Sequence, residues 1–167
     1  MARKVFYSFH YQLDSWRVQT VMNMGQVEGQ PLLGSQAWED VAKGGDAAIK
    51  RWIDEQMKGK SCDVVLIGSR TAGRPWVNYE IEKAWNSGKG VVGIYIYNLR
   101  DQHGNTTTKG ANPFSGFTVG EGWNNKSLDQ VVKAYNPGGR TSQEVYSTIA
   151  TNIADWIEEA IDIRGKW

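Results

Sequence analysis

Short apolar runs alternate along this chain with longer segments in which apolar residues recur at helical spacing. Residues 4–9 are aromatic and β-branched, which predicts a first strand. Residues 63–68 and 91–97 are almost continuously apolar, which is typical of strands covered on both faces. Two weaker apolar segments, 32–38 and 128–134, predict further short strands. The pattern therefore indicates a sheet whose central strands are parallel.

Four helices are predicted between and after these strands. Each has a start signal, either a capping side chain or a proline, and three of them end at or just before a glycine. The expected helices run from Asp14 or Ser15 to Gly25, from Asp46 to Gly59, from Pro75 to Gly88, and onward from a capping box at residues 141–144.

Strands that alternate with helices predict an α/β fold, with a mostly parallel central sheet flanked by helices. We expect a single domain over residues 1–167, because no repeat or linker divides the chain. A long irregular loop, rich in Gly, Asn and Thr, is expected at about 98–125, either as a functional or as a mobile segment. Ligands in such folds bind beyond the carboxyl ends of the strands, so the residues that follow the strands at 4–9 and 63–68 are the first candidates for a site.

Composition removes several classes of function. The 19 Lys and Arg residues balance 18 Asp and Glu residues, so no basic field exists to hold a nucleic acid. The single cysteine, Cys62, excludes an intrachain disulfide, and His10 and His103 show no metal-binding spacing. No apolar run approaches the roughly 20 residues that cross a bilayer, and the first residues lack an export signal. We expect a cytoplasmic protein without a metal, nucleic-acid or membrane partner.

Three well-known motifs of α/β proteins, namely the phosphate-binding loop, the phospho-aspartate receiver site and the dinucleotide-binding loop, are absent from this sequence. Residues 68–75 have glycines at phosphate-loop spacing, but Arg74 and Pro75 stand where Lys and Ser or Thr are required. The strand ends lack the acidic residues of a phospho-aspartate receiver, and no G-x-G-x-x-G sequence follows a strand. The loop at 68–75 can still bind an anion through backbone N–H groups, although an ordinary turn explains the same residues.

Two segments together resemble a known family. The first is VFYSFH at residues 5–10, followed by Asp14, and the second is VLIGS at residues 65–69, followed by WVNYE at residues 76–80. They are similar to the TIR domain, and more closely to the bacterial TIR-like family of the Thoeris antiphage system. That family also carries a WED sequence and a G-x-NPF sequence, found here at residues 38–40 and 110–114. The resemblance covers residues 3 to about 117 and implies a flavodoxin-like TIR fold.

Catalytic members of this family cleave the nicotinamide–ribose bond of NAD, and the resemblance implies that Glu80 is the catalytic carboxylate. Glu82 lies about 200° further around the helix and cannot face the same pocket, whereas Trp76 shares the face of Glu80. One carboxylate suits this reaction, because nicotinamide leaves as a neutral molecule and only the positive charge on the ribose needs stabilising. Spacing alone favours the alternative of a solvated charge.

Aromatic and polar residues near Glu80 are the expected substrate-binding groups. Phe6, Phe9 and Trp76 can stack on nicotinamide or adenine, although core packing is the alternative for each ring. Ser69 and Arg74 belong to the loop that can hold the diphosphate.

Four polar residues complete the set of candidates. Ser8 and His10 lie at the ligand end of the first strand, where a hydrogen-bonded structural role is the alternative for His10. Arg17 and Asp40 are weaker candidates, since an ion pair on the surface explains them equally well.

The resemblance implies that NAD is the substrate and that no separate cofactor is needed. The product would be a signalling ADP-ribose derivative, either a cyclic isomer or a conjugate, that activates a separate effector protein. Self-association and a phage-derived trigger are also implied. Two other interpretations remain open, a non-catalytic TIR scaffold and an enzyme similar to nucleoside deoxyribosyltransferases, and release of nicotinamide from NAD distinguishes them.

Overall fold

Five parallel strands form the central sheet in the computed structural model of the protein, which describes residues 3–33 and 35–167. The strands are β1 (Lys4–Ser8), β2 (Glu28–Gly29), β3 (Cys62–Ile67), β4 (Gly90–Tyr95) and β7 (Ala134–Tyr135). Their order across the sheet is β2-β1-β3-β4-β7, and every neighbouring pair is parallel. The two outer strands pair through only two residues each. The predicted α/β fold with a parallel central sheet is confirmed.

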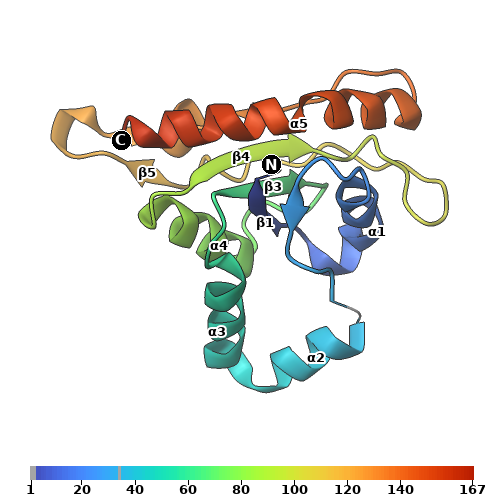
Figure 1. The fold of residues 1–167 in the computed structure, drawn as a ribbon, viewed down its shortest axis with the longest axis horizontal. Helices are drawn as coiled ribbons and strands as arrows, with labels where there is room; N and C mark the ends of the chain where they lie inside the picture. Colours follow the sequence, from blue (N-terminus) through green and yellow to red (C-terminus); the bar gives the residue numbers. More distant parts are fainter. Residues whose placement is uncertain (1–2, 34) are drawn as a thin grey trace.

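Helices cover both faces of this sheet. They are α1 (Tyr11–Met22), α2 (Ser35–Lys43), α3 (Gly45–Met57), α4 (Pro75–Asn86) and α5 (Ser142–Gly165). One core cluster joins the sheet to α1 and α5, and a second joins it to α3 and α4. Figure 1 shows α5 along one side of the sheet and α3 and α4 on the other. None of the helices within the described residues is long and apolar enough to cross a membrane.

Alternation along the strands decides which side chains face each core. In β1, Val5 and Tyr7 belong to the cluster with α1 and α5, whereas Phe6 belongs to the cluster with α3 and α4. In β3, Val64 lies in the first cluster and Val65 in the second. Because side chains alternate along a strand, the polar residues Ser8 and Asp63 also face α3 and α4. This face of the sheet carries the candidate site.

Two of the predicted helix boundaries follow the expected signals closely. Pro75 occupies the first turn of α4, and Gly88, just after its end, adopts a φ of 77° that favours glycine. Thr141 caps α5 by accepting a hydrogen bond from the backbone N–H of Glu144 at 3.1 Å. These predictions are confirmed.

Two other helix starts were predicted wrongly. α1 begins at Tyr11, because His10 caps it through ring nitrogen Nδ1, which accepts a hydrogen bond from the N–H of Leu13 at 3.2 Å. Asp14, one of the expected caps, is buried in the first turn of that helix. Gly44 precedes α3, and the expected cap Asp46 lies inside its first turn. Both errors arise because the capping residue precedes the acidic one that is also favourable near a helix N-terminus.

Two short strands were also predicted wrongly. Residues 32–38 include no strand among the described residues, since β2 lies earlier and α2 begins at Ser35. Residues 128–134 begin instead with a 3₁₀ turn, η2 (Leu128–Gln130), and only Ala134 joins the sheet. Trp38, expected on a strand, lies on the amphipathic helix α2 and packs against the core with α3.

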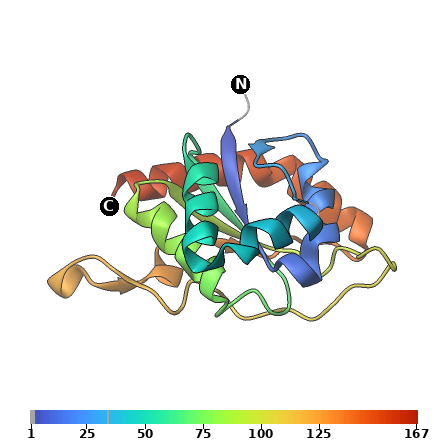
Figure 2. The ribbon, with the colours of Figure 1, turned by 90° about the horizontal axis from the view of Figure 1, so that it is seen from below.

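The segment expected as an irregular loop at 98–125 contains regular structure at its end. β5 (Thr118–Val119) pairs antiparallel with β6 (Lys126–Ser127), and η1 (Gly122–Asn124) lies between them. Figure 2 shows this hairpin, in orange, projecting from the body of the protein. Phe114 is fully buried and anchors the segment against the core, whereas Trp123 is fully exposed at the hairpin.

Candidate active site

Helix α4 places Glu80 on its buried side. The buried residues of this helix are Val77, Glu80, Ile81 and Ala84, which are spaced as one face of a helix. Glu80 thus occupies a position that an apolar residue would ordinarily fill, and only 8% of its surface is exposed. Glu82 is exposed, as its position on the opposite face predicts. The alternative interpretation of Glu80, a solvated charge on the helix surface, is therefore wrong.

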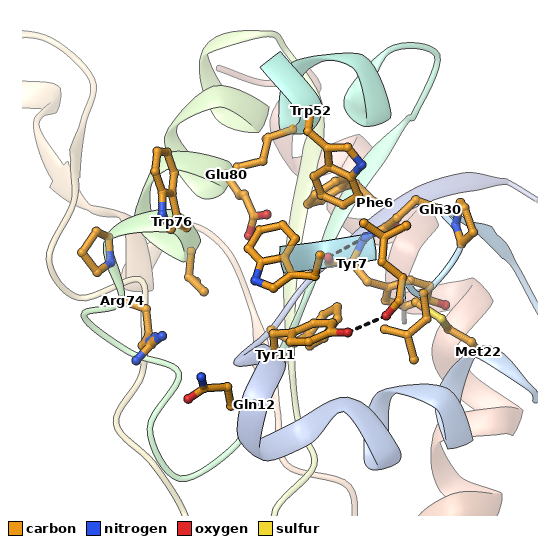
Figure 3. Close-up of a pocket in the computed structure, with 18 residues that line it drawn as sticks. Phe6, Tyr7, Tyr11, Gln12, Met22, Gln30, Trp52, Arg74, Trp76 and Glu80 are labelled. Carbon is orange, nitrogen blue, oxygen red and sulfur yellow. Dashed lines mark hydrogen bonds between the residues drawn. The ribbon is translucent and has the colours of Figure 1, made fainter. Parts of the chain in front are cut away.

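Glu80 lines a pocket enclosed by β1, α1, α2, α3 and the start of α4. The pocket encloses a cavity of about 160 Å³ that opens to solvent at its mouth. In Figure 3 the carboxylate of Glu80 points into this space, with Trp76 on one side and Phe6 on the other. Arg74 and Gln12 lie toward the far end of the pocket from Glu80. A ligand in the pocket can therefore contact a buried carboxylate at one end and a guanidinium near the other.

Aromatic rings from four elements form one wall of the pocket. Tyr11 of α1 stacks on Trp38 of α2, with ring centres 5.7 Å apart and an interplanar angle of 29°. Trp38 contacts the edge of Trp52 of α3 at 5.7 Å, and Trp52 contacts Phe6 of β1 at 6.5 Å. The hydroxyl of Tyr11 donates to the carbonyl oxygen of Leu33 at 2.6 Å. Flat rings of this kind suit a heteroaromatic ligand.

Glu80 has an acidic neighbour beneath the pocket. Asp63 of β3 has no exposed surface, and its Oδ1 accepts a hydrogen bond from the Ser8 hydroxyl at 2.7 Å. Burial, together with the charge of Asp63, raises the pKa of Glu80 well above its usual value, while a hydrogen bond from Ser8 opposes this rise. Burial also raises the pKa of Asp63 to about 7, again opposed by Ser8. Both carboxyl groups are therefore more easily protonated than ordinary acids.

The structure separates the expected substrate-binding residues into two groups. Phe6, Phe9, Arg74 and Trp76 line the pocket together with Glu80. Ser8 is fully buried behind the pocket, where it bonds to Asp63. The substrate-binding roles of the four pocket residues stay predictions. Ser8 instead contacts the buried carboxyl group of Asp63.

Two of the expected binding residues, His10 and Ser69, are not among the described residues that line the pocket. His10 is 5% exposed, and burial together with the nearby positive charge of Arg74 lowers its pKa, so it stays neutral at pH 7. Its Nδ1 is occupied by the cap of α1. Ser69 lies in the turn after β3, where the N–H of Gly68 donates to the Thr71 hydroxyl at 2.8 Å. The structural alternative for His10, a hydrogen-bonded cap, is what the geometry shows.

The two weaker candidates differ from each other. Arg17 is 4% exposed and pairs with the buried Asp14, so its interpretation as half of a surface ion pair is wrong. Asp40 is 63% exposed at the side chain and lies 4.0 Å from the Lys43 ammonium, as a surface pair would. Neither Arg17 nor Asp40 lines the pocket.

Asp63 and three of the pocket rings were not predicted from the sequence as parts of the site. Tyr11, Trp38 and Trp52 each fall at positions that suit an amphipathic helix, so periodicity alone assigns them to the core. Asp63 carried a clearer signal, since it is an acid at the start of an otherwise apolar run that predicts a fully buried strand. Within residues 3–33 and 35–167, no group of three or more His, Cys, Asp or Glu side chains is placed to hold a metal ion.

The parallel sheet, its flanking helices and a glutamate buried beside an aromatic pocket define a TIR-like α/β protein. Residues 6–101 match the family described as "Thoeris protein ThsB, TIR-like domain", and the chain belongs to that family. The resemblance noted in the sequence is thereby confirmed.

A named relative supports the same assignment. The chain is 42% identical over 119 residues to a protein of Bacillus cereus (strain MSX-D12) named "Putative cyclic ADP-D-ribose synthase ThsB1". The match covers 68% of this chain and 62% of the relative's length.

Proposed function

We propose that this protein cleaves the nicotinamide–ribose bond of NAD and converts the ADP-ribose portion into a cyclic signalling nucleotide. The observation that carries the proposal is Glu80, a carboxylate that points into a pocket walled by aromatic rings and is almost withdrawn from water. The Bacillus cereus relative carries the name "Putative cyclic ADP-D-ribose synthase ThsB1", which supports the same chemistry.

The positive charge of the substrate matches the environment of Glu80. The nicotinamide ring of NAD is cationic, and breaking its bond to the ribose carbon leaves neutral nicotinamide and a ribosyl cation. A carboxylate in a pocket of low polarity stabilises that cation more strongly than it would in water. The same cation favours the ionised form of Glu80 against the burial that raises its pKa.

Cyclisation follows if a nucleophile of the same ADP-ribose attacks the ribose carbon. The attacking group forms the new bond to that carbon and then gives up any proton that it carries to water. Attack by water itself gives linear ADP-ribose, and attack by another small molecule gives a conjugate. Burial of the site and its aromatic wall favour the intramolecular route, because they exclude water from the reacting carbon.

Other groups of the pocket fit the remaining parts of NAD. Arg74, near the far end from Glu80, suits a phosphate oxygen of the diphosphate. The rings of Tyr11, Trp38 and Trp76 offer flat surfaces for the nicotinamide and adenine bases. The bond is broken without oxidation or reduction, so NAD acts as substrate and no further cofactor is required.

The product is the proposed link to other proteins. We place the reaction in the cytoplasm, where NAD is available, and assign the cyclic nucleotide to activation of a separate effector during antiphage defence. Self-association and a phage-derived trigger belong to the same proposal.

Nicotinamide release tests this function directly. The chain is incubated with NAD, alone and under crowding that forces assembly, and nicotinamide and ADP-ribose products are separated by chromatography. We expect Glu80→Gln to lower release by about 100-fold or more, because it removes the charge that stabilises the cation. Glu82→Gln, the matched change on the exposed face of α4, should leave the rate within a factor of two.

Three results would contradict the proposal. Equal release by the wild type and Glu80→Gln would remove Glu80 from the chemistry. No release under any condition, while other TIR domains bind, would favour a scaffold. Cleavage of deoxynucleosides in place of NAD would favour a nucleoside deoxyribosyltransferase-like enzyme.

A further inference from the structure

Asp63 is an acidic residue at a fully buried position of a central strand, where an apolar residue would be expected. Strand β3 is buried at all six of its residues, and Asp63 has no exposed surface. Among the described residues, none of the ion pairs includes Asp63, and its Oδ2 has no hydrogen-bond partner. A buried carboxylate without a cation destabilises a protein, and an apolar residue of similar size would be more favourable there. The burial of Asp63 therefore calls for a functional explanation.

The surroundings of Asp63 connect it to Glu80. Strand alternation places Asp63 on the face of the sheet that carries α3 and α4, beside Ser8 of the neighbouring strand. Ser8 donates to Asp63 Oδ1 at 2.7 Å, and Glu80 projects from α4 on the same face. Burial, and after it the charge of Asp63, raises the pKa of Glu80, and the Ser8 hydroxyl opposes the rise in the pKa of both carboxyl groups. Asp63 and Glu80 are thus two buried carboxyl groups on the same face of the sheet, and we call them the acidic pair.

We propose that Asp63 is a positioning residue for Glu80: in the empty pocket the acidic pair holds one proton, and Glu80 becomes fully ionised when a cationic group occupies the pocket. The inference rests on the proposed function only for its consequence on the reaction rate. When the cation binds, the O–H bond of the protonated carboxyl breaks and its proton passes to water. The Glu80 carboxylate is thus formed next to the ribose carbon on which positive charge develops in the proposed reaction.

The other charged and titratable groups facing the pocket do not compete for this role. Among the described lining residues they are Tyr7 on β1, Tyr11 on α1 and Arg74 before α4, while α2 and α3 contribute indole rings. Burial raises the pKa of both tyrosines, so they stay neutral around pH 7. Arg74 contributes a guanidinium toward the far end of the pocket from Glu80. Cys62, next to Asp63 on β3, faces the opposite core, and burial raises its pKa further from neutrality.

Two substitutions that should shift the pKa of Glu80 in opposite directions test the proposal through the pH profile of nicotinamide release. Asp63→Asn keeps an oxygen that can accept from Ser8 but removes the neighbouring charge, so the acidic limb of kcat/KM should move to lower pH by about one unit or more. Ser8→Ala removes a hydrogen bond that favours ionisation, so the limb should move to higher pH. Glu82→Gln should leave the limb in place. A residue that only supports the fold would change the rate without moving the limb.

Proton release on binding gives a second measurement that needs no turnover. A carbocyclic NAD analogue keeps the nicotinamide cation but cannot be cleaved, and calorimetry in buffers of different ionisation enthalpy counts the protons released as it binds. We expect up to one proton near pH 7 for the wild type and a smaller fraction for Asp63→Asn. NADH, whose dihydronicotinamide ring is uncharged, should release none.

Titration of the carboxyl groups by carbon NMR in the empty protein separates failure of the inference from failure of the proposed function. We expect a carboxyl signal that titrates near or above pH 7 in the wild type, with the Glu80 signal moving to lower pH in Asp63→Asn. If NAD is not cleaved but the titration shows this coupling, only the proposed function fails. An unchanged Glu80 titration in Asp63→Asn overturns the inference. If Asp63→Asn does not fold, the wild type and Ser8→Ala decide by the same titration.

Discussion

Arg17 and Asp14 form an ion pair inside the protein, with Arg17 Nη1 3.1 Å from Asp14 Oδ1 and side chains that are 4% and 1% exposed. Arg17 also donates to the carbonyl oxygens of Leu99 at 2.8 Å and Asn105 at 2.9 Å. One guanidinium thus ties helix α1 to the segment that follows β4, close to the edge of the sheet where the pocket opens.

Loss of this guanidinium should destabilise the protein strongly. We expect Arg17→Ala to lower the free energy of unfolding by about 3–5 kcal/mol, because it leaves the Asp14 carboxylate buried without its cation. Urea denaturation measures the change. Arg3→Ala is the matched control, since the pair that Arg3 forms with Glu158 is about half exposed, with side chains 48% and 50% accessible. That control should lose far less stability, because exposed ion pairs contribute little, and a comparable loss in both variants would contradict the prediction.

Replacing Asp63 by asparagine should stabilise the protein, and more so at high pH. Burial raises the native pKa of Asp63 from 3.8 to about 7, so between these values the native state binds more protons than the unfolded state. Stability is therefore highest below the unfolded pKa and is lost as the pH rises toward 7. Thermal melts should show a gain for Asp63→Asn that is larger at pH 8 than at pH 5 by roughly 2 kcal/mol. A gain independent of pH would mean that Asp63 does not titrate in the native protein.

The aromatic wall should determine how well NAD binds. Trp38→Ala removes the ring that contacts both Tyr11 and Trp52, and we expect KM for NAD to rise roughly tenfold. Trp123→Ala is the control, because that ring is fully exposed on the hairpin away from the pocket. Steady-state release of nicotinamide measures both variants, and an unchanged KM in Trp38→Ala would exclude the wall from substrate binding.

Gly110 should not tolerate a side chain. A Cβ at this position would lie 2.2 Å from the carbonyl oxygen of Gly68 and 3.0 Å from that of Ser69, and backbone atoms cannot move aside easily. We expect Gly110→Ala to lower the melting temperature by several degrees and to expose the 98–117 segment to proteolysis, at a cost of roughly 1–3 kcal/mol. Gly116→Ala, where a Cβ meets nothing within 4 Å, serves as the control and should melt like the wild type.

The sheet was predictable where the apolar runs were long. Residues 63–68 and 91–97 could hardly be anything other than strands buried on both faces, and β3 and β4 lie there. The outer strands escaped prediction because each pairs through two residues, too few to leave a pattern in the sequence. Trp38 was assigned to a strand because a short apolar segment does not distinguish a strand from a helix.

The candidate site was predictable only in part, and for a physical reason. Glu80 could be placed from the resemblance, and four of the seven expected binding residues lie with it around the pocket: Phe6, Phe9, Arg74 and Trp76. Ser8 and Asp63 come from strands that are adjacent in space but more than fifty residues apart in the chain. Their contact depends on strand order, which the periodicity of a single segment does not contain.

The brevity of β2 and β7 also bears on how copies of this protein can meet. A sheet with two long edge strands exposes a row of unpaired amide and carbonyl groups, to which a strand of another molecule can add. Here the borders present only a few such groups, and long helices shield the broad faces. Any self-association of this protein is therefore expected to use side chains on its helices and loops, an arrangement that can be reversed, rather than to extend the sheet into fibrils.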